Sequence, residues 1–146
     1  GDAFHPRENI ERMASASETE LSRMPAVVRE MHEKSGLLER IRASTVSLAD
    51  AERQTADFLR AYVGDKTAPL CGNSVWKDKQ FLEKYMPNVI GLLHYRLVDV
   101  STIKELVRRW YPPELAAPKK SEKHRAMEDI LESLAELAHY RAKIFR

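Results

Sequence analysis

Two short segments, residues 68–71 and 95–100, have the patterns expected of β-strands. The first is an apolar run that ends at Gly72, so it predicts a buried strand, and the second alternates polar and apolar residues. Amphipathic segments with helical spacing lie before, between and after them, which predicts an α/β layered fold. Two strands are too few for a stable sheet, so residues 1–16 are expected to form either an arm or a further strand.

The helices are predicted from apolar residues at spacings of three and four and from the residues at their ends. Ser17 and Glu20 have the spacing of a capping box, and Ser101 with Thr102 is predicted to cap the helix that precedes Pro112. The last helix is expected to bury one apolar face, made of Met127, Ile130, Leu131, Leu134, Leu137 and Ala138. The predicted helices cover about residues 25–34, 37–41, 48–62, 75–86, 102–110 and 125–144.

The composition is that of one globular domain, residues 1–146. Of the 146 residues 43% are apolar and 32% are charged, which suffices for a real core. The net charge of +2 argues against a surface that coats long duplexes, but it allows a small anionic ligand in a local pocket. No apolar run is long enough to span a membrane, and no signal peptide is found. The lone cysteine, Cys71, is expected to be a small residue of the core. A single cysteine excludes an internal disulfide and indicates a reducing compartment.

An imidazole and a carboxylate, His124 and Asp129, lie close together at the start of the last predicted helix. Five helical residues rotate by about 500°, so the two side chains share a face only if His124 lies in the loop or the first turn. A metal-binding carboxylate beside a histidine base is what metal-assisted phosphodiester hydrolysis requires. Taken alone, the same spacing also fits helix capping and solvation.

A second candidate site is the turn Gly72-Asn73-Ser74, between the first strand and the helix that follows. The turn offers backbone N–H groups and a hydroxyl to a phosphate, and Asp78 offers hard oxygen to Mg²⁺ or Mn²⁺. A carboxylate in the first turn of a helix is also favoured by the helix dipole, whatever the function.

Three segments together resemble the oligoribonucleases, small 3′-to-5′ exoribonucleases of the DEDD class with a histidine as the fifth motif residue. The segments are residues 71–82, 94–102 and 124–129, and they occur in the family's order and separations. The resemblance extends over about residues 17–146. It implies a helix-rich, ribonuclease H-like α/β fold, a homodimer, and RNA substrates of about two to five nucleotides. The family works in the cytoplasm, and its eukaryotic members also in mitochondria.

The resemblance also implies roles for individual residues. Two divalent ions, Mg²⁺ or Mn²⁺, are held by four carboxylates in the family, and Asp78 and Asp129 match two of them. His124 matches the general base that activates the attacking water. The residues that match the cap for the substrate's 5′ phosphate are Ser74, Arg96, Ser101 and Thr102, together with Tyr95, which comes from the partner subunit.

Two features of the family's pattern are absent from this sequence. The Asp-x-Glu motif that supplies the other two carboxylates is not found, since Glu18-x-Glu20 begins with glutamate and lies at a helix start. Val27 stands where the family has a tryptophan, whose loss would cost about 1–3 kcal/mol of base stacking. We therefore expect the N-terminal strands of the sheet to be missing, and this chain to turn over little RNA while the full gene product is active. The alternative is a catalytically incomplete module that binds short RNA or dimerises.

Overall fold

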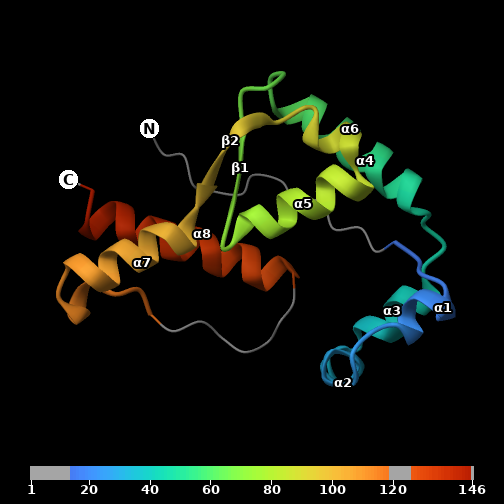
Figure 1. Cartoon of the computed structure of the whole chain (residues 1–146). Helices are drawn as coiled ribbons and strands as arrows, with labels where there is room; N and C mark the ends of the chain where they lie inside the picture. The colour runs from blue at the N-terminus through green and yellow to red at the C-terminus, as the bar shows by residue number, and fades with distance from the viewer. Residues whose placement is uncertain (1–13, 119–125, 146) are drawn as a thin grey trace.

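The computed structural model describes residues 14–118 and 126–145 (Figure 1). The elements in chain order are α1 (Glu18–Ser22), α2 (Ala26–Lys34), α3 (Leu37–Ala43), α4 (Leu48–Tyr62), β1 (Pro69–Gly72), α5 (Val75–Tyr85), α6 (Pro87–Ile90), β2 (His94–Asp99), α7 (Val100–Trp110), the 3-10 helix η1 (Pro113–Leu115) and α8 (Ala126–Lys143). None of the described helices is both long enough and apolar enough to cross a membrane.

The strands β1 and β2 pair in parallel, as expected for an α/β fold, and the chain crosses between them through α5 and α6. The register places Gly72 beside Asp99, so both strands end at the same level. The turn after β1 therefore meets the start of α7. Helix α5 contacts both strands, and Figure 1 shows α7 (orange) and α8 (red) side by side near the end of the sheet where β1 and β2 finish.

The core that supports this end of the sheet lies between α7 and α8. Val100, Val107 and Tyr140 form its buried centre, and Tyr140 is only 1% exposed. Partly buried apolar residues from both helices and the connecting loop pack around it: Ile103, Ala117, Leu137 and Ile144. Because α7 follows β2 directly, this packing holds the N-terminus of α7 against the sheet.

The N-terminal helices form a separate group, away from α7 and α8 (Figure 1). The predicted capping box is confirmed, since the Ser17 backbone N–H donates to Glu20 Oε2 over 2.8 Å and the Glu20 N–H donates to Ser17 Oγ over 3.3 Å. Val27, where the resemblance expects an aromatic residue, is 79% exposed on α2. A parallel bridge joins Ala14 to Val46, so one strand-like contact does lie at the end of the segment predicted as an arm or strand. Residues 1–13 of that segment lie outside the described part of the chain.

The capping prediction for α7 is wrong. Asp99 is the N-cap, and its side chain accepts from the Ser101 N–H over 2.9 Å, while Ser101 and Thr102 are already inside the helix. The reason is that β2 runs directly into α7 with no intervening loop.

The chain also forms α6 immediately after α5, with Pro87 at its first position, where the missing N–H costs nothing.

The predicted buried face of α8 is also wrong in part. Ile130 and Leu131 are 52% and 46% exposed, whereas Glu136 and Tyr140 are 5% and 1% exposed. The face of α8 that packs against β1 and α7 is therefore rotated away from the purely apolar stripe. Ile130 lines a groove instead of a core.

The prediction that Cys71 is a buried core residue is wrong as well, because its side chain is exposed. β1 does not follow the pattern of a fully buried strand, since exposed and half-buried residues alternate along it. Cys71 lies on the groove wall described below, which no described element covers.

Candidate active site

A groove of about 730 Å³ lies between β1, α5 and α8. Asp78 from α5 and Asp129 from α8 both line it. The other residues of the groove are Leu70, Cys71, Gly72, Asn73, Val75, Phe81, Leu82, Ala126, Ile130, Ser133 and Leu134. The two carboxylates predicted as metal ligands are therefore brought to one site from distant parts of the sequence.

Each of these carboxylates lies in the first turn of its helix. Asp78 follows the turn after β1, and Asp129 follows Ala126, the first residue of α8. The exposed N–H groups at a helix start carry partial positive charge, which stabilises a carboxylate there. Both side chains are exposed, so their oxygens are accessible to a ligand in the groove.

The groove carboxylates suit Mg²⁺ or Mn²⁺, which prefer hard oxygen ligands, but they form only part of a ligand set. Within residues 14–118 and 126–145, no group of three or more His, Cys, Asp or Glu side chains is placed to hold a metal ion. Asp78 and Asp129 therefore fit as two ligands of a divalent ion, with the remaining positions left to substrate, water or residues outside the described part.

The turn after β1 is held by side chains from the start of α7. Ser74 has a left-handed backbone, with φ of 53°, and its N–H donates to Asp99 Oδ1 over 3.0 Å and to Ser101 Oγ over 2.8 Å. The hydroxyl oxygens of Ser74 and Ser101 lie 3.3 Å apart. The two serines predicted to bind phosphate thus lie together, with their hydroxyl oxygens in contact. The Ser74 N–H is already engaged by Asp99 and Ser101.

Asn73 connects this serine pair to α8. Its Nδ2 donates to Ser133 Oγ over 2.8 Å and to Glu136 Oε2 over 3.2 Å, and its Oδ1 accepts from Ser101 Oγ over 3.2 Å. The sequence pattern predicts the turn but assigns no role to Asn73, Asp99 or Glu136. One available signal is that Glu136 follows Asp129 by seven residues, or about two helical turns, which places both on one face of α8.

Arg96 and Tyr95, two other residues predicted for the phosphate cap, contact each other and not the Ser74–Ser101 pair. Arg96 Nε donates to the Tyr95 hydroxyl over 3.1 Å, and its guanidinium carbon is 5.5 Å from the centre of the Tyr95 ring. Both side chains are exposed, Tyr95 by 74%. Thr102 is exposed in the first turn of α7, and neither Arg96 nor Tyr95 lines the groove. Their contact with a phosphate stays a prediction.

The predicted base, His124, belongs to residues 119–125 and lies outside the described part of the chain. Its role as a base is therefore still a prediction. Helix α8 begins at Ala126, directly after those residues, and carries Asp129 in its first turn.

The cysteine in the groove is a poor nucleophile. Partial burial of its thiol raises the pKa of Cys71, and the negative charge of Asp99 raises it further. Since the thiolate is the reactive form of cysteine, this shift lowers the reactivity of Cys71 at neutral pH.

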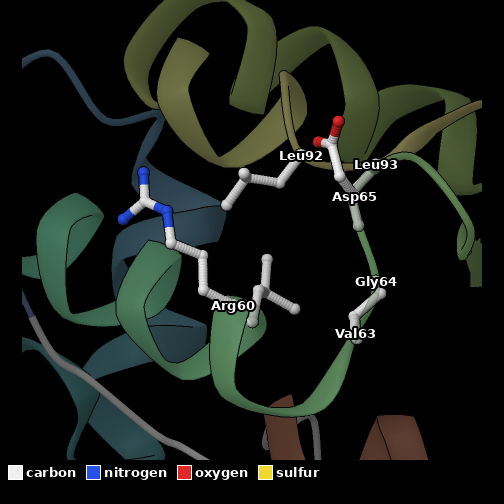
Figure 2. A pocket seen from close by; sticks show the side chains of 7 residues that line it. Arg60, Val63, Gly64, Asp65, Leu92 and Leu93 are labelled. Atoms are coloured by element: carbon white, nitrogen blue, oxygen red, sulfur yellow. The ribbon is translucent and has the colours of Figure 1, made fainter.

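A second cavity, of about 250 Å³, lies where α4 ends and approaches the segment before β2 (Figure 2). Leucine and valine side chains form much of its wall, and Arg60 and Asp65 are its charged residues. Arg60 is held by Asp57 on its own helix, over 2.9 Å. This cavity shares no residue with the groove, and its charged groups do not form a recognisable catalytic set.

Known exonucleases are similar to this chain over most of its length. The RNase T family model, described as an exonuclease, matches residues 6–137. An oligoribonuclease of Paracidovorax citrulli is 50% identical over 125 residues, which are 86% of this chain and 65% of that protein. An oligoribonuclease of Aeromonas hydrophila is 48% identical over 130 residues, which are 89% of this chain and 72% of that protein.

The human protein "Oligoribonuclease, mitochondrial" is 51% identical over 119 residues, which are 81% of this chain and 50% of the human protein. This chain spans 65% of the length of the Paracidovorax relative, a little less than two thirds. The exonuclease match confirms the expected ribonuclease H-like α/β fold. The matched domain and the identity to these relatives show that the chain belongs to the oligoribonuclease family of exonucleases.

Proposed function

We propose that this protein is a metal-dependent 3′-to-5′ exoribonuclease that degrades RNAs of about two to five nucleotides to mononucleotides. The observation that carries the proposal is the groove, because Asp78 and Asp129 line it together while the turn that contains Ser74 borders it. A metal-binding groove that borders the turn of the proposed phosphate cap suits a very short substrate. The names of the relatives, all oligoribonucleases, support the same activity.

In this proposal the residues of the chain divide the work by their chemistry. Asp78 and Asp129 hold Mg²⁺ or Mn²⁺ at the scissile phosphate, and His124 takes the proton of the attacking water. When bound, two divalent ions would activate that water and stabilise the leaving oxygen. The hydroxyls of Ser74, Ser101 and Thr102 would donate to the 5′ phosphate, for which the Ser101 hydroxyl would turn away from Asn73 Oδ1, and the Arg96 guanidinium would supply positive charge. That cap limits the length of RNA that fits.

The assembly and compartment are part of the same proposal. Tyr95 is 74% exposed, as expected of a side chain that completes the site of a partner subunit in a homodimer. We place the protein in the cytoplasm or in mitochondria, and the name of the human relative supports the mitochondrial location.

A second candidate function is a catalytically incomplete module that binds short RNA or dimerises. One observation favours it, namely that the described residues contain no group of three or more possible metal ligands. This module would bind a dinucleotide through the cap and would be indifferent to a chelator. A two-metal enzyme would require divalent ions for productive binding.

The experiment that tests the proposal follows a 5′-labelled RNA dinucleotide with and without Mn²⁺. We expect metal-dependent cleavage by the full gene product. This cleavage should be lost in Asp78→Ala and in Asp129→Ala. The matched control is Asp57→Ala, which removes an exposed carboxylate of α4 that pairs with Arg60 and does not line the groove. Cleavage that persists in Asp129→Ala would overturn the proposed site, and metal-independent binding without cleavage would support the second candidate.

A further inference from the structure

The two walls of the groove are joined at Asn73. This residue lies in the turn between β1 and α5, directly before Ser74, the N-cap of α5. Its side-chain Nδ2 donates to two residues of α8, to Ser133 Oγ over 2.8 Å and to Glu136 Oε2 over 3.2 Å. Its Oδ1 accepts from Ser101 Oγ of α7 over 3.2 Å. One amide thus ties the turn to both of these helices.

The Asn73 amide is already engaged by the protein. An amide nitrogen carries two protons, and here one is directed at each of the two acceptors on α8. Asn73 lines the groove, but neither of its amide protons is left for a ligand there. The side chain is therefore suited to hold other groups in position.

The point on α8 to which Asn73 is attached is itself held firmly. Glu136 is 5% exposed, and Lys104 Nζ lies 3.2 Å from its Oε1. The hydroxyl of Tyr140, a residue of the core between α7 and α8, donates to the same Oε1 over 3.3 Å. A charge is costly to bury unless it is paired and hydrogen-bonded, so these partners restrict the movement of Glu136. Asn73 is thus anchored to a fixed part of α8.

Both proposed metal ligands are close to Asn73 along the chain or through one hydrogen bond. Asp78 lies in the first turn of α5, the helix that begins directly after the turn. On α8, the Ser133 hydroxyl donates to the Asp129 backbone oxygen over 2.7 Å. Residues 129 and 133 are about one helical turn apart, so they share a face of α8. The Asn73 contacts therefore fix the start of α5 relative to the part of α8 that carries Asp129.

We propose that Asn73 is a positioning residue that sets the separation of the Asp78 and Asp129 carboxylates, and thereby the affinity of the groove for divalent ions. This inference rests on the proposed function, because the two carboxylates are its metal ligands. Two ions that act together in phosphodiester hydrolysis lie roughly 3.5–4 Å apart, so their ligands tolerate little movement. Residues that orient metal ligands affect metal affinity by about 10–100-fold without touching the ion.

The first test is the dissociation constant of Mn²⁺, measured by electron paramagnetic resonance on the full gene product without RNA. We expect Asn73→Ala to weaken Mn²⁺ binding about tenfold or more. Ser133→Ala keeps the contact between Asn73 and Glu136 and should weaken binding less. The matched control is Asn88→Ala, which truncates an exposed asparagine of α6 that does not line the groove. Equal Mn²⁺ affinity in Asn73→Ala and the parent would overturn the inference.

A destabilised variant distinguishes positioning from a general loss of structure. Leu38 is 1% exposed in α3 and does not line the groove, so Leu38→Ala should lower the unfolding midpoint and leave the Asn73 contacts intact. We expect this variant to bind Mn²⁺ as the parent does, at a temperature where both are folded. An equal loss of affinity in Leu38→Ala and Asn73→Ala would assign the effect to general destabilisation and overturn the positioning role.

A measurement without metal separates this inference from the proposed function. Spin labels on Lys84→Cys of α5 and Ala135→Cys of α8, two exposed positions, report the separation of the helices by pulsed electron paramagnetic resonance. Cys71→Ser removes the native thiol from the labelled protein. We expect Asn73→Ala to broaden the distribution of separations. If it does so while the parent binds no Mn²⁺, the proposed metal site fails and the positioning role is supported. An unchanged distribution would overturn the positioning role.

Discussion

The backbone N–H of Ser74 donates to the carboxylate of Asp99 over 3.0 Å, which joins the turn after β1 to the start of α7. The same carboxylate oxygen accepts from the Ser101 N–H as the N-cap of α7. One side chain thus satisfies two backbone donors on elements that are far apart in sequence. The position of the turn depends on this shared acceptor.

Replacing Asp99 with alanine is expected to lower the free energy of unfolding by about 1–3 kcal/mol, because it removes a helix cap and leaves the Ser74 donor with one fewer partner. Asp99→Asn keeps a carbonyl oxygen and should lose less. Urea unfolding of both variants, followed by circular dichroism, measures the difference. An alanine variant as stable as the parent would show that water replaces the carboxylate at no cost.

Because Ser74 has a left-handed backbone, two substitutions there can test its effects on stability and on binding separately. Ser74→Gly relieves a strain of about 1 kcal/mol but adds freedom to the unfolded chain, so its stability should stay within about 1 kcal/mol of the parent. Ser74→Val puts a β-branched residue at a φ of 53° and should be clearly less stable. Both variants lack the hydroxyl and should bind a 5′-phosphorylated dinucleotide more weakly. Equal stability of the two variants in thermal unfolding would contradict the strain argument.

Arg96 provides a test of the charge at the proposed cap. Arg96→Ala should weaken binding of a 5′-phosphorylated dinucleotide about tenfold or more, because a charge-assisted hydrogen bond contributes roughly 1.5–3 kcal/mol. The 5′-hydroxyl dinucleotide should be little affected, and Arg96→Lys should fall between. Titration calorimetry gives both constants, with the exposed Arg53→Ala on α4 as control. A similar loss for both dinucleotides would place Arg96 outside the phosphate contact.

The exposure of Cys71 can be measured by alkylation. We expect iodoacetamide to modify the folded protein, because the thiol lies on the groove wall. The reaction should be slower at neutral pH than that of a free cysteine and should accelerate in alkali, since the thiol pKa is raised. Mass spectrometry with and without denaturant follows the rate. Modification only after unfolding would restore the prediction of a buried core residue.

The raised pKa of the Tyr140 phenol predicts a loss of folding stability in alkali. Its burial and the neighbouring Glu136 carboxylate raise the pKa of its phenol above the ordinary value of about 10. The unfolded chain therefore ionises first, so the contribution of this group is fully present below about pH 10 and is lost as the pH rises through the folded pKa. Tyr140→Phe should remove this part of the pH dependence, at a cost of about 1 kcal/mol for the lost hydrogen bond. Unfolding free energies at neutral and alkaline pH test it, and identical slopes for the two proteins would contradict it.

The sequence predicted those parts of the fold that depend on local patterns. The strand before Gly72, the helix closed at Gly64 and the capping box at Ser17 are close to their predicted places, because spacing and capping act over a few residues. The shared groove of Asp78 and Asp129 was implied only by the family resemblance.

The errors arose where tertiary contacts decide. Apolar spacing favoured burial of Ile130 and Leu131, but the face of α8 against β1 and α7 carries Glu136 and Tyr140. A buried glutamate is stable only beside Asn73, Lys104 and Tyr140, which no local pattern reveals. Cys71 was misplaced for a similar reason, since the pattern of a strand does not show whether another element covers it.

Strand β1 has a consequence for self-association. Within the described residues β2 is its one hydrogen-bonded neighbour, so the far edge of β1 presents backbone groups to which another chain can add. Two features restrict such growth. The strand is four residues long, and Pro69 at its start has no N–H to offer a template. Another chain would find few consecutive backbone donors at this edge. The edge is therefore less prone to aggregation by strand addition than a longer edge without proline.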